Sequence, residues 1–237
     1  MMGLDFSAFP TAVVAETKEL WLAARHRYVT ASEVGALFAC NPYKSRKALL
    51  KEKSAPWAGE GRSSGPMRAG QFLEEGIVRW WDDDLTTTHL RMSLPPPTTH
   101  MCRTANHTSV MVRHPDEACR VAASPDAISR DGYNILVEAK LHGPKSWDGG
   151  QPTDLAGDLA RKNLPPCPGI DGARCWATLV QYLQVQVQML VTDIHMACVV
   201  RCWGTERRDT YIPACPALHA MIETRVGEFW AEVARGG

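Results

Sequence analysis

The sequence predicts an α/β fold in which a mixed central β-sheet is flanked by helices. Three observations favour this class. Hydrophobic residues make up 45% and charged residues 22% of the 237 residues, as in ordinary globular proteins. Apolar residues recur at helical spacing in several segments, and short β-branched, apolar stretches between turn residues indicate strands. A chain of this length can bury a sizeable core, so we expect a single domain over 1–237 with its core at about 16–235.

Helices are expected near both ends of the chain and between the strands. An amphipathic pattern covers 16–27, and the capping-box pattern Thr30-Ala-Ser-Glu33 predicts the start of a second helix. Ser45 can cap a third helix that runs to Lys53. Its lysines and Arg46 form either a solvated face or a face turned to DNA. Further helices are expected at 67–81, 154–162 and 176–191, and at 216–234 behind Pro216.

Strands are expected at 108–113, 119–123 and 134–140, where a β-meander is the simplest arrangement, and at 194–202. In 82–106, the prolines at 95–97 and the threonines at 86–88, 98 and 99 argue for an irregular connection or short edge strands. Residues 143–175 are rich in Gly and Pro and are predicted to form a long excursion, which is usually functional or disordered.

Charge and cysteine content limit the classes of function. The chain has 26 basic and 26 acidic residues, so no long-range basic field attracts nucleic acid, although a narrow DNA channel needs only local basic residues. Eight cysteines occur without a C-x-x-C pair and without a secretory signal, which predicts reduced thiols in a cytoplasm. Because no run of 18 apolar residues occurs, we expect no membrane partner.

The strongest chemical signal is Pro125-Asp126, followed by Glu138-Ala139-Lys140 at the end of an apolar stretch. On adjacent strands the two carboxylates would meet at one edge of the sheet, and alternation would put Glu138 and Lys140 on the same face. The alternative interpretation is a turn aspartate and a surface ion pair.

Paired carboxylates repel each other, and a divalent cation relieves this repulsion. Mg²⁺ prefers oxygen ligands, so we expect it at Asp126, Glu138 and the carbonyl of Ala139, with Mn²⁺ able to substitute. Lys140 would then lie near an attacking water, which it can orient or acidify.

Four separated blocks resemble a known family. They are Trp21-x-x-x-Arg25 leading into Val29-Thr-Ala-Ser-Glu-Val34, Gly70-Gln-Phe-Leu-Glu74, Ser124-Pro-Asp126 with Glu138-Ala-Lys140, and Gln184-Val-Gln186 with Met189-x-Val-Thr192. In this order they resemble the lambda exonuclease and YqaJ-like viral recombinase nucleases, a branch of the restriction-endonuclease-like PD-(D/E)xK fold. The family commonly has Gly after the Pro-Asp pair, where this chain has Ala127.

The resemblance implies a role for each matching residue. Asp126 and Glu138 are the implied metal ligands and Lys140 the catalytic lysine. Glu74 is the implied helix carboxylate, or Glu75 if the register shifts by one. The other implied site residues are Gln184 in the active site, and Arg25 and Ser32 at the terminal 5′ phosphate of DNA; Gln188 is expected to be structural.

The activity that the resemblance implies is Mg²⁺-dependent 5′ to 3′ digestion of one strand of linear double-stranded DNA. Mononucleotides are released, and a 3′ overhang is left for a single-strand annealing protein. The resemblance also implies a homotrimer encoded by a phage or prophage and acting in the bacterial cytoplasm. The alternatives are an inactive or weakly active DNA-end-binding recombination module, or another nuclease of the same fold, of the endonuclease or iron-sulfur type. The eight tryptophans are expected to lie mostly in the core, and for Trp57, Trp147 and Trp176, which lie in or beside predicted loops, stacking on bases is the second interpretation.

Overall fold

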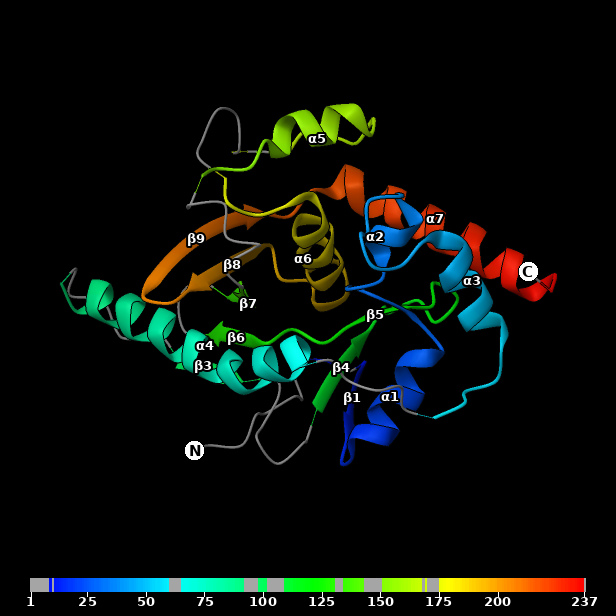
Figure 1. Cartoon of the computed structure of the whole chain (residues 1–237), viewed down its shortest axis with the longest axis horizontal. Coiled ribbons are helices and arrows are strands. Elements are labelled where there is room, and N and C mark those ends of the chain that lie inside the picture. Colours follow the sequence, from blue (N-terminus) through cyan, green and yellow to red (C-terminus); the bar gives the residue numbers. More distant parts are fainter. Residues whose placement is uncertain are drawn as a thin grey trace.

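A computed structural model describes residues 9, 11–59, 65–91, 98–101, 109–130, 134–142, 151–167, 169 and 175–236. Figure 1 shows how its elements are arranged. In chain order they are β1 (Ala12–Ala15), α1 (Lys18–His26), β2 (Val29–Thr30), α2 (Val34–Leu37), α3 (Arg46–Ser54), α4 (Gly65–Arg91), β3 (Thr98–Met101), β4 (Ser109–Arg113), β5 (Val121–Ala123), β6 (Ala127–Arg130), β7 (Ile135–Leu141), α5 (Leu155–Arg161), α6 (Leu179–Thr192), β8 (Met196–Trp203), β9 (Glu206–Pro213) and α7 (Pro216–Ala234).

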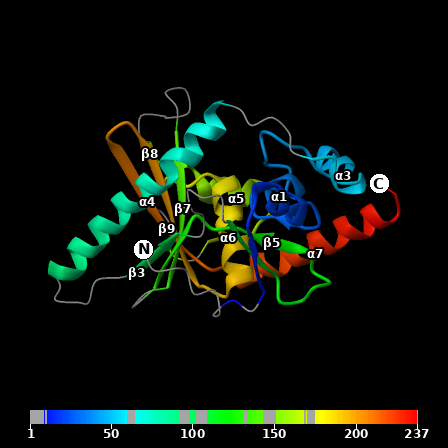
Figure 2. The same ribbon diagram turned by 90° about the horizontal axis from the view of Figure 1, so that it is seen from below.

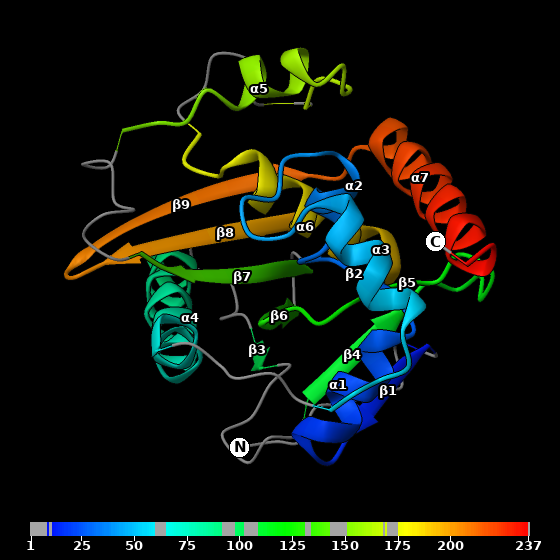
Figure 3. The same ribbon diagram turned by 45° about the vertical axis from the view of Figure 1, so that its right-hand side comes forward.

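The described strands form two mixed sheets. The first has the order β1-β4-β5-β2 and the second β3-β6-β7-β8-β9. Each contains one parallel pair, β2 with β5 and β7 with β8, while the other pairs are antiparallel. In Figure 3, β9, β8, β7 and β6 follow one another down the second sheet. The chain crosses from one sheet to the other between β5 and β6, and residues 124–126 form this crossing.

Helices cover both faces of the larger sheet. Ile77, Val78 and Trp81 of α4 pack with Val137 and other residues of β6, β7 and β8 that point to that face, and Figure 2 shows α4 running obliquely along this side. The opposite face packs against α6 and α7 in the main core. Alternation along β7 therefore divides its side chains between α4 and α6.

Helix α6 is buried almost all round, because it packs against strands of both sheets and against α2, α5 and α7. Thr178 caps its first turn in a capping box with Gln181, each side chain bonding the other's backbone amide. Gln186 is fully buried. Its amide donates to Pro213 O at 2.9 Å, and its Oε1 accepts from Cys215 N at 2.9 Å and contacts His219 Nε2 at 2.9 Å.

The predicted mixed α/β class is confirmed. Five of the predicted helices are also confirmed, and they correspond to α1, α3, α5, α6 and α7. The second predicted helix is only the single turn α2, which begins after Glu33. The Glu33 carboxylate accepts from Thr30 N as the pattern implies, but the Thr30 hydroxyl donates to that carboxylate instead of capping an amide.

Other predictions were wrong in extent or pairing. Helix α4 continues ten residues past the expected end at 81. By contrast, Thr98–Met101 is an edge strand, which confirms one of the two interpretations of 82–106 for this segment. The β-meander is wrong because β4 and β5 belong to one sheet while β6 and β7 belong to the other. Four described strands were missed, namely β1, β2, β6 and β9. Of the expected excursion, residues 143–150, which include Trp147, lie outside the described part.

Ala127 needs no special backbone. It is the buried first residue of β6, and it is not among the described non-glycine residues with positive φ. No helix within the described ranges has both the length and the apolar composition to cross a membrane.

Replacing Gln186 should destabilise the protein sharply. Gln186→Met keeps most of the volume but leaves the buried Cys215 N–H and Pro213 carbonyl without their partner, so we expect a loss of about 2–4 kcal/mol in the free energy of unfolding, measured by urea denaturation. The matched control is Gln151→Met, because Gln151 is exposed. A variant at 186 as stable as the control would show that these contacts carry little free energy.

Candidate active site

The carboxylate of Glu138 is buried in the middle of the larger sheet. β7 is the third of five strands, and only 2% of Glu138 is exposed. Its Oε1 accepts hydrogen bonds from Lys140 Nζ and Gln184 Nε2, and its Oε2 accepts one from Gln188 Nε2. A buried carboxylate is tolerated only when it is paired and hydrogen-bonded, and these three donors meet that need.

Asp126 reaches the same place from the crossing between the two sheets. Its Oδ2 accepts a hydrogen bond from the backbone N–H of Ala139 at 2.7 Å. The site thus lies beside the central strand β7, at the point where the chain crosses from one sheet to the other. The prediction that it lies at one edge of the sheet is wrong. Ala139 itself packs on the α4 side, as alternation predicted.

Helix α4 contributes the third carboxylate. Glu74 hydrogen-bonds with Asp126 and lines the same cleft. Its neighbour Glu75 instead pairs with Arg79 one turn along the helix. The structure therefore brings Glu74, and not the fallback residue Glu75, to the other acidic groups.

Burial and neighbouring negative charge raise the pKa of two of these carboxyl groups, Asp126 and Glu138. Burial, followed by the negative charge of Asp126, raises the pKa of Glu138 to about 7. Burial and the charge of Glu74 raise the pKa of Asp126. Burial alone would lower the pKa of Lys140, but Glu138 and Asp126 outweigh it and the net shift is upward. Lys140 thus remains an ammonium at neutral pH.

The donor set fits a divalent cation. When the three carboxylates are ionised, the ammonium of Lys140 leaves two negative charges uncompensated, and a cation can replace the proton that the raised pKa values otherwise favour. Within the described residues, no three His, Cys, Asp or Glu side chains are grouped as a metal site on their own. Mg²⁺ does not need such a group, because it keeps several waters and binds through one or two carboxylates.

A second group of polar residues surrounds Arg25 at the end of α1. The guanidinium lies 4.2 Å from the ring centroid of Trp21, and its Nη2 donates to Ser32 Oγ at 3.1 Å and to Thr30 Oγ1 at 3.2 Å. The Trp21 ring in turn donates to Ser124 Oγ at 3.2 Å. Ser124 precedes Pro125-Asp126, so this contact ties α1 to the acidic group.

Glu33 is the acidic residue that holds this second group together. It accepts from Thr30 Oγ1 at 2.9 Å and pairs with Lys44 at 3.2 Å and Lys53 at 3.0 Å. Burial alone would raise the pKa of Glu33, but Lys53, Lys44 and Arg25 lower it to about 2. The side chain of Lys53 is 2% exposed, and its Nζ also donates to Arg25 O at 3.3 Å.

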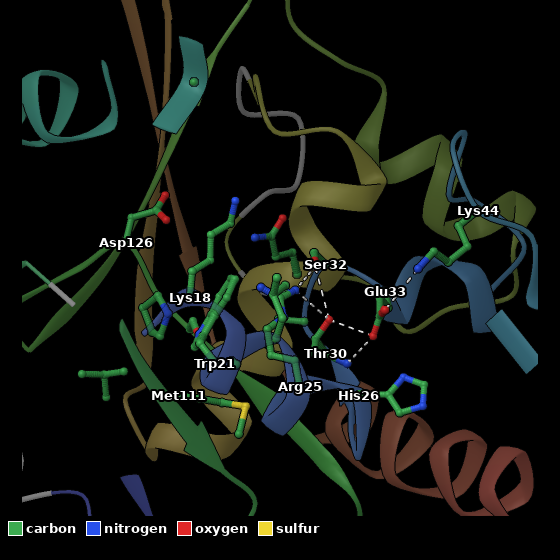
Figure 4. Close-up of a pocket in the computed structure, with 18 of the residues that line it drawn as sticks. Lys18, Trp21, Arg25, His26, Thr30, Ser32, Glu33, Lys44, Met111 and Asp126 are labelled. Atoms are coloured by element: carbon green, nitrogen blue, oxygen red, sulfur yellow. Dashed lines mark hydrogen bonds and ion pairs between the residues drawn. The ribbon is translucent and has the colours of Figure 1, made fainter. Parts of the chain in front are cut away.

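One cleft of about 880 Å³ connects the two groups. In the close-up of Figure 4, Asp126 lies on one side of the cleft, Arg25, Thr30 and Ser32 lie near its middle, and His26 lies beyond them. The acidic residues Glu74, Asp126 and Glu138 are thus separated along one cavity from the residues around Arg25.

Two sequence-based interpretations change at this point. Gln188, expected to be structural, donates directly to Glu138, and only the i,i+4 spacing with Gln184 could have signalled this. The basic run on α3 is neither one solvated face nor one DNA face, because Lys44 and Lys53 turn inward to Glu33 while Arg46 pairs with Glu232.

The segment that carries most of the site residues matches a known protein family. The model of the YqaJ-like viral recombinase domain matches residues 20–166. The chain belongs to this family. Its members are nucleases, and the predicted enzyme class is thereby confirmed. The match contains Arg25, Ser32, Glu74, Asp126 and the Glu138–Lys140 segment, whereas α6 lies outside it. No curated protein matches the sequence of this YqaJ-like chain.

Solved structures share the fold of this YqaJ-like protein. An alkaline exonuclease from Laribacter hongkongensis superimposes with a TM-score of 0.59 and 20% identity, over 91% of this chain and 92% of that one. The same exonuclease in complex with dAMP gives a TM-score of 0.58 at 20% identity, with the same coverage. These likenesses confirm the restriction-endonuclease-like fold.

Glu33 should make stability depend on pH. Because its pKa in the folded protein, about 2, lies below the ordinary glutamate value of 4.5, its contribution to stability is complete above pH 4.5 and is lost as pH falls towards 2. We expect Glu33→Gln to reduce the free energy of unfolding by about 3 kcal/mol at neutral pH, since it leaves Lys53 buried without its partner. Denaturant unfolding at several pH values measures this loss, which should shrink below pH 4.5.

The matched control is Glu52→Gln, because Glu52 pairs with Lys44 but its side chain is 44% exposed. A surface pair of this kind is worth less than about 1 kcal/mol. Equal losses for the two variants at neutral pH would show that Glu33 is no more than a surface charge.

Proposed function

We propose that this chain digests one strand of linear double-stranded DNA from its 5′ end and leaves a 3′ single-stranded overhang. The observation that best supports this is the single cleft lined both by the carboxylates and by Arg25 and Ser32. A terminal phosphate at Arg25 would leave the next phosphodiester directed to Asp126 and Glu138. Cleavage would then release the terminal nucleotide.

Asp126, Glu138 and the carbonyl of Ala139 would hold Mg²⁺, with Mn²⁺ able to substitute. Such a cation supplies Lewis acidity towards a phosphodiester and makes water a better nucleophile. Gln184 and Gln188 fix the Glu138 carboxylate from α6, so its oxygens keep their direction when substrate enters. Glu74 adds a third carboxylate beside Asp126.

Lys140 would act as a cation in this reaction. Its raised pKa makes it a poor proton acceptor, so a general-base role is disfavoured. An ammonium at this position can orient the attacking water and stabilise negative charge that develops on the phosphate. This role agrees with its place in the Glu138-Ala-Lys140 segment.

Arg25 and Ser32 would bind the 5′ phosphate. A guanidinium makes strong charge-assisted hydrogen bonds to phosphate oxygens, and Trp21 and Thr30 hold this one in place before DNA arrives. The alkaline exonuclease with the same fold binds dAMP, and we propose deoxynucleoside monophosphates as the products here. We further propose a homotrimer, an annealing protein as partner, and action in the cytoplasm of a bacterial host by a phage or prophage protein.

The first test uses the adjacent glutamates of α4. Glu74→Gln should slow Mg²⁺-dependent nucleotide release from end-labelled linear duplex on the order of a hundredfold or more, whereas Glu75→Gln should retain activity because Glu75 pairs with Arg79. Excess chelator should stop the unmutated protein, and added Mg²⁺ should restore it. Activity of Glu74→Gln with loss in Glu75→Gln, or cleavage in chelator, would overturn the proposed site.

The second test concerns polarity. If Arg25 binds a 5′ phosphate, 5′-phosphorylated ends should be digested faster than 5′-hydroxyl ends at matched salt, and Arg25→Ala should remove this preference. A charge-assisted contact of this kind corresponds to roughly a ten- to hundredfold change in rate. Arg27→Ala is the control, because Arg27 lies two residues away and is exposed. Equal rates on both ends for the unmutated protein would refute the proposed polarity.

A further inference from the structure

The cleft does not end at Arg25 and Ser32. Beyond them it is also lined by His26 at the end of α1, by Glu52 and Lys53 at the end of α3, and by residues 55–59 of the following loop. Figure 4 shows His26 on the opposite side of Arg25 and Thr30 from Asp126. The cavity therefore has space past the proposed position of the terminal phosphate.

Trp57 stands in this part of the cleft. Trp57 is 40% exposed although it lines a concave cavity. Its ring lies 5.6 Å from the ring of His26, centroid to centroid, at a tilt of 51°. Nε2 of His26 lies 2.9 Å from the backbone oxygen of Ala55, which fixes the loop carrying Trp57 to the end of α1. The indole is thus held in place while much of its surface stays open.

We infer that Trp57 and His26 form a base-stacking subsite that takes a nucleotide of a 5′ overhang on the strand being digested. This inference rests on the proposed function, because it assumes that cleavage takes place at Asp126 and that Arg25 contacts a phosphate.

The chemistry of this end of the cleft suits a nucleotide. An open indole offers a π-face to any base, and burying it there would recover apolar surface that is otherwise left to water. The cations Arg25 and Lys44 lie on this side of Asp126, and both line the cleft. The nearby acids are already engaged, since Glu33 pairs with Lys44 and Lys53, and Glu52 pairs with Lys44. Base and phosphate could both be contacted here.

The order of Asp126, Arg25 and Trp57 along the cleft determines which type of DNA end can reach Trp57. With a phosphodiester at Asp126 and the next phosphate towards the 5′ end at Arg25, a base at Trp57 belongs to a nucleotide farther in the 5′ direction. A blunt phosphorylated end has no such nucleotide, whereas a 5′ overhang does. In that case Arg25 contacts an internal phosphate, and the overhang continues past it.

The test is a binding measurement without metal, so that no cleavage occurs. Fluorescence-labelled duplexes carry either a short 5′ overhang with normal bases or the same overhang with abasic residues. The unmutated protein should bind the first roughly five- to a hundredfold more tightly, which is the usual range for stacking on one aromatic side chain. Trp57→Ala should erase that difference, and Trp57→Phe should retain most of it.

Trp80→Ala is the matched control, because Trp80 is 39% exposed but lies on α4 against Arg207, with 5.2 Å from the guanidinium to its ring. It should preserve the difference between the two overhangs. No preference for the normal overhang in the unmutated protein, or an undiminished preference in Trp57→Ala, would overturn the subsite. The comparison of ligands on the unmutated protein decides the matter even if a variant fails to fold.

Digestion of blunt duplex separates this inference from the proposed function. If blunt phosphorylated ends are digested with Mg²⁺ but base removal from the overhang changes nothing, only the subsite is wrong. If blunt ends are not digested at all, the proposed function fails first.

Discussion

The buried carboxylate of Glu138 is the group on which the arrangement of the site depends. It lies on the central strand of the larger sheet, and its oxygens accept hydrogen bonds from Lys140 on its own strand and from Gln184 and Gln188 on α6. An ionised carboxylate in this position would be strongly unfavourable without such donors. The same contacts fix the distance and rotation of α6 relative to β7. Stability and the direction of the carboxylate oxygens therefore rest on one set of hydrogen bonds.

Helix α6 makes further buried hydrogen bonds besides those to Glu138. It packs against strands of both sheets, so several of its polar side chains are buried and need hydrogen-bond partners from other elements. Gln181 closes the N-terminal capping box, Gln188 reaches Glu138, and Gln186 bonds the segment that joins β9 to α7. Gln186 and Gln188 thus connect α6 to two different parts of the fold. Moving the helix would break several buried hydrogen bonds at once, which favours one rigid position.

Charge is separated along the cleft although the whole chain is neutral. The 26 acidic and 26 basic residues cancel in the total, but Glu74, Asp126 and Glu138 gather at one end while Arg25 stands farther along. A cation is attracted to the first group and a phosphate to the second. Net charge was therefore a poor guide to the ligand, because short-range pairing at the cleft decides the local field.

Sequence alone determined the features that depend on neighbouring residues. Helical spacing and Pro216 located the last helix, and Ser45 located the start of α3 as its cap. Alternation in Glu138-Ala-Lys140 placed two site residues on one face of their strand. The tertiary structure decided what depends on distant partners. It split the predicted meander at residues 124–126, chose Glu74 over Glu75, and turned Gln188 and Lys53 towards buried carboxylates. Periodicity shows which face of a helix or strand is apolar, but a buried polar side chain is placed by the partner it finds across the core, and that partner is set only when the sheets and helices have packed.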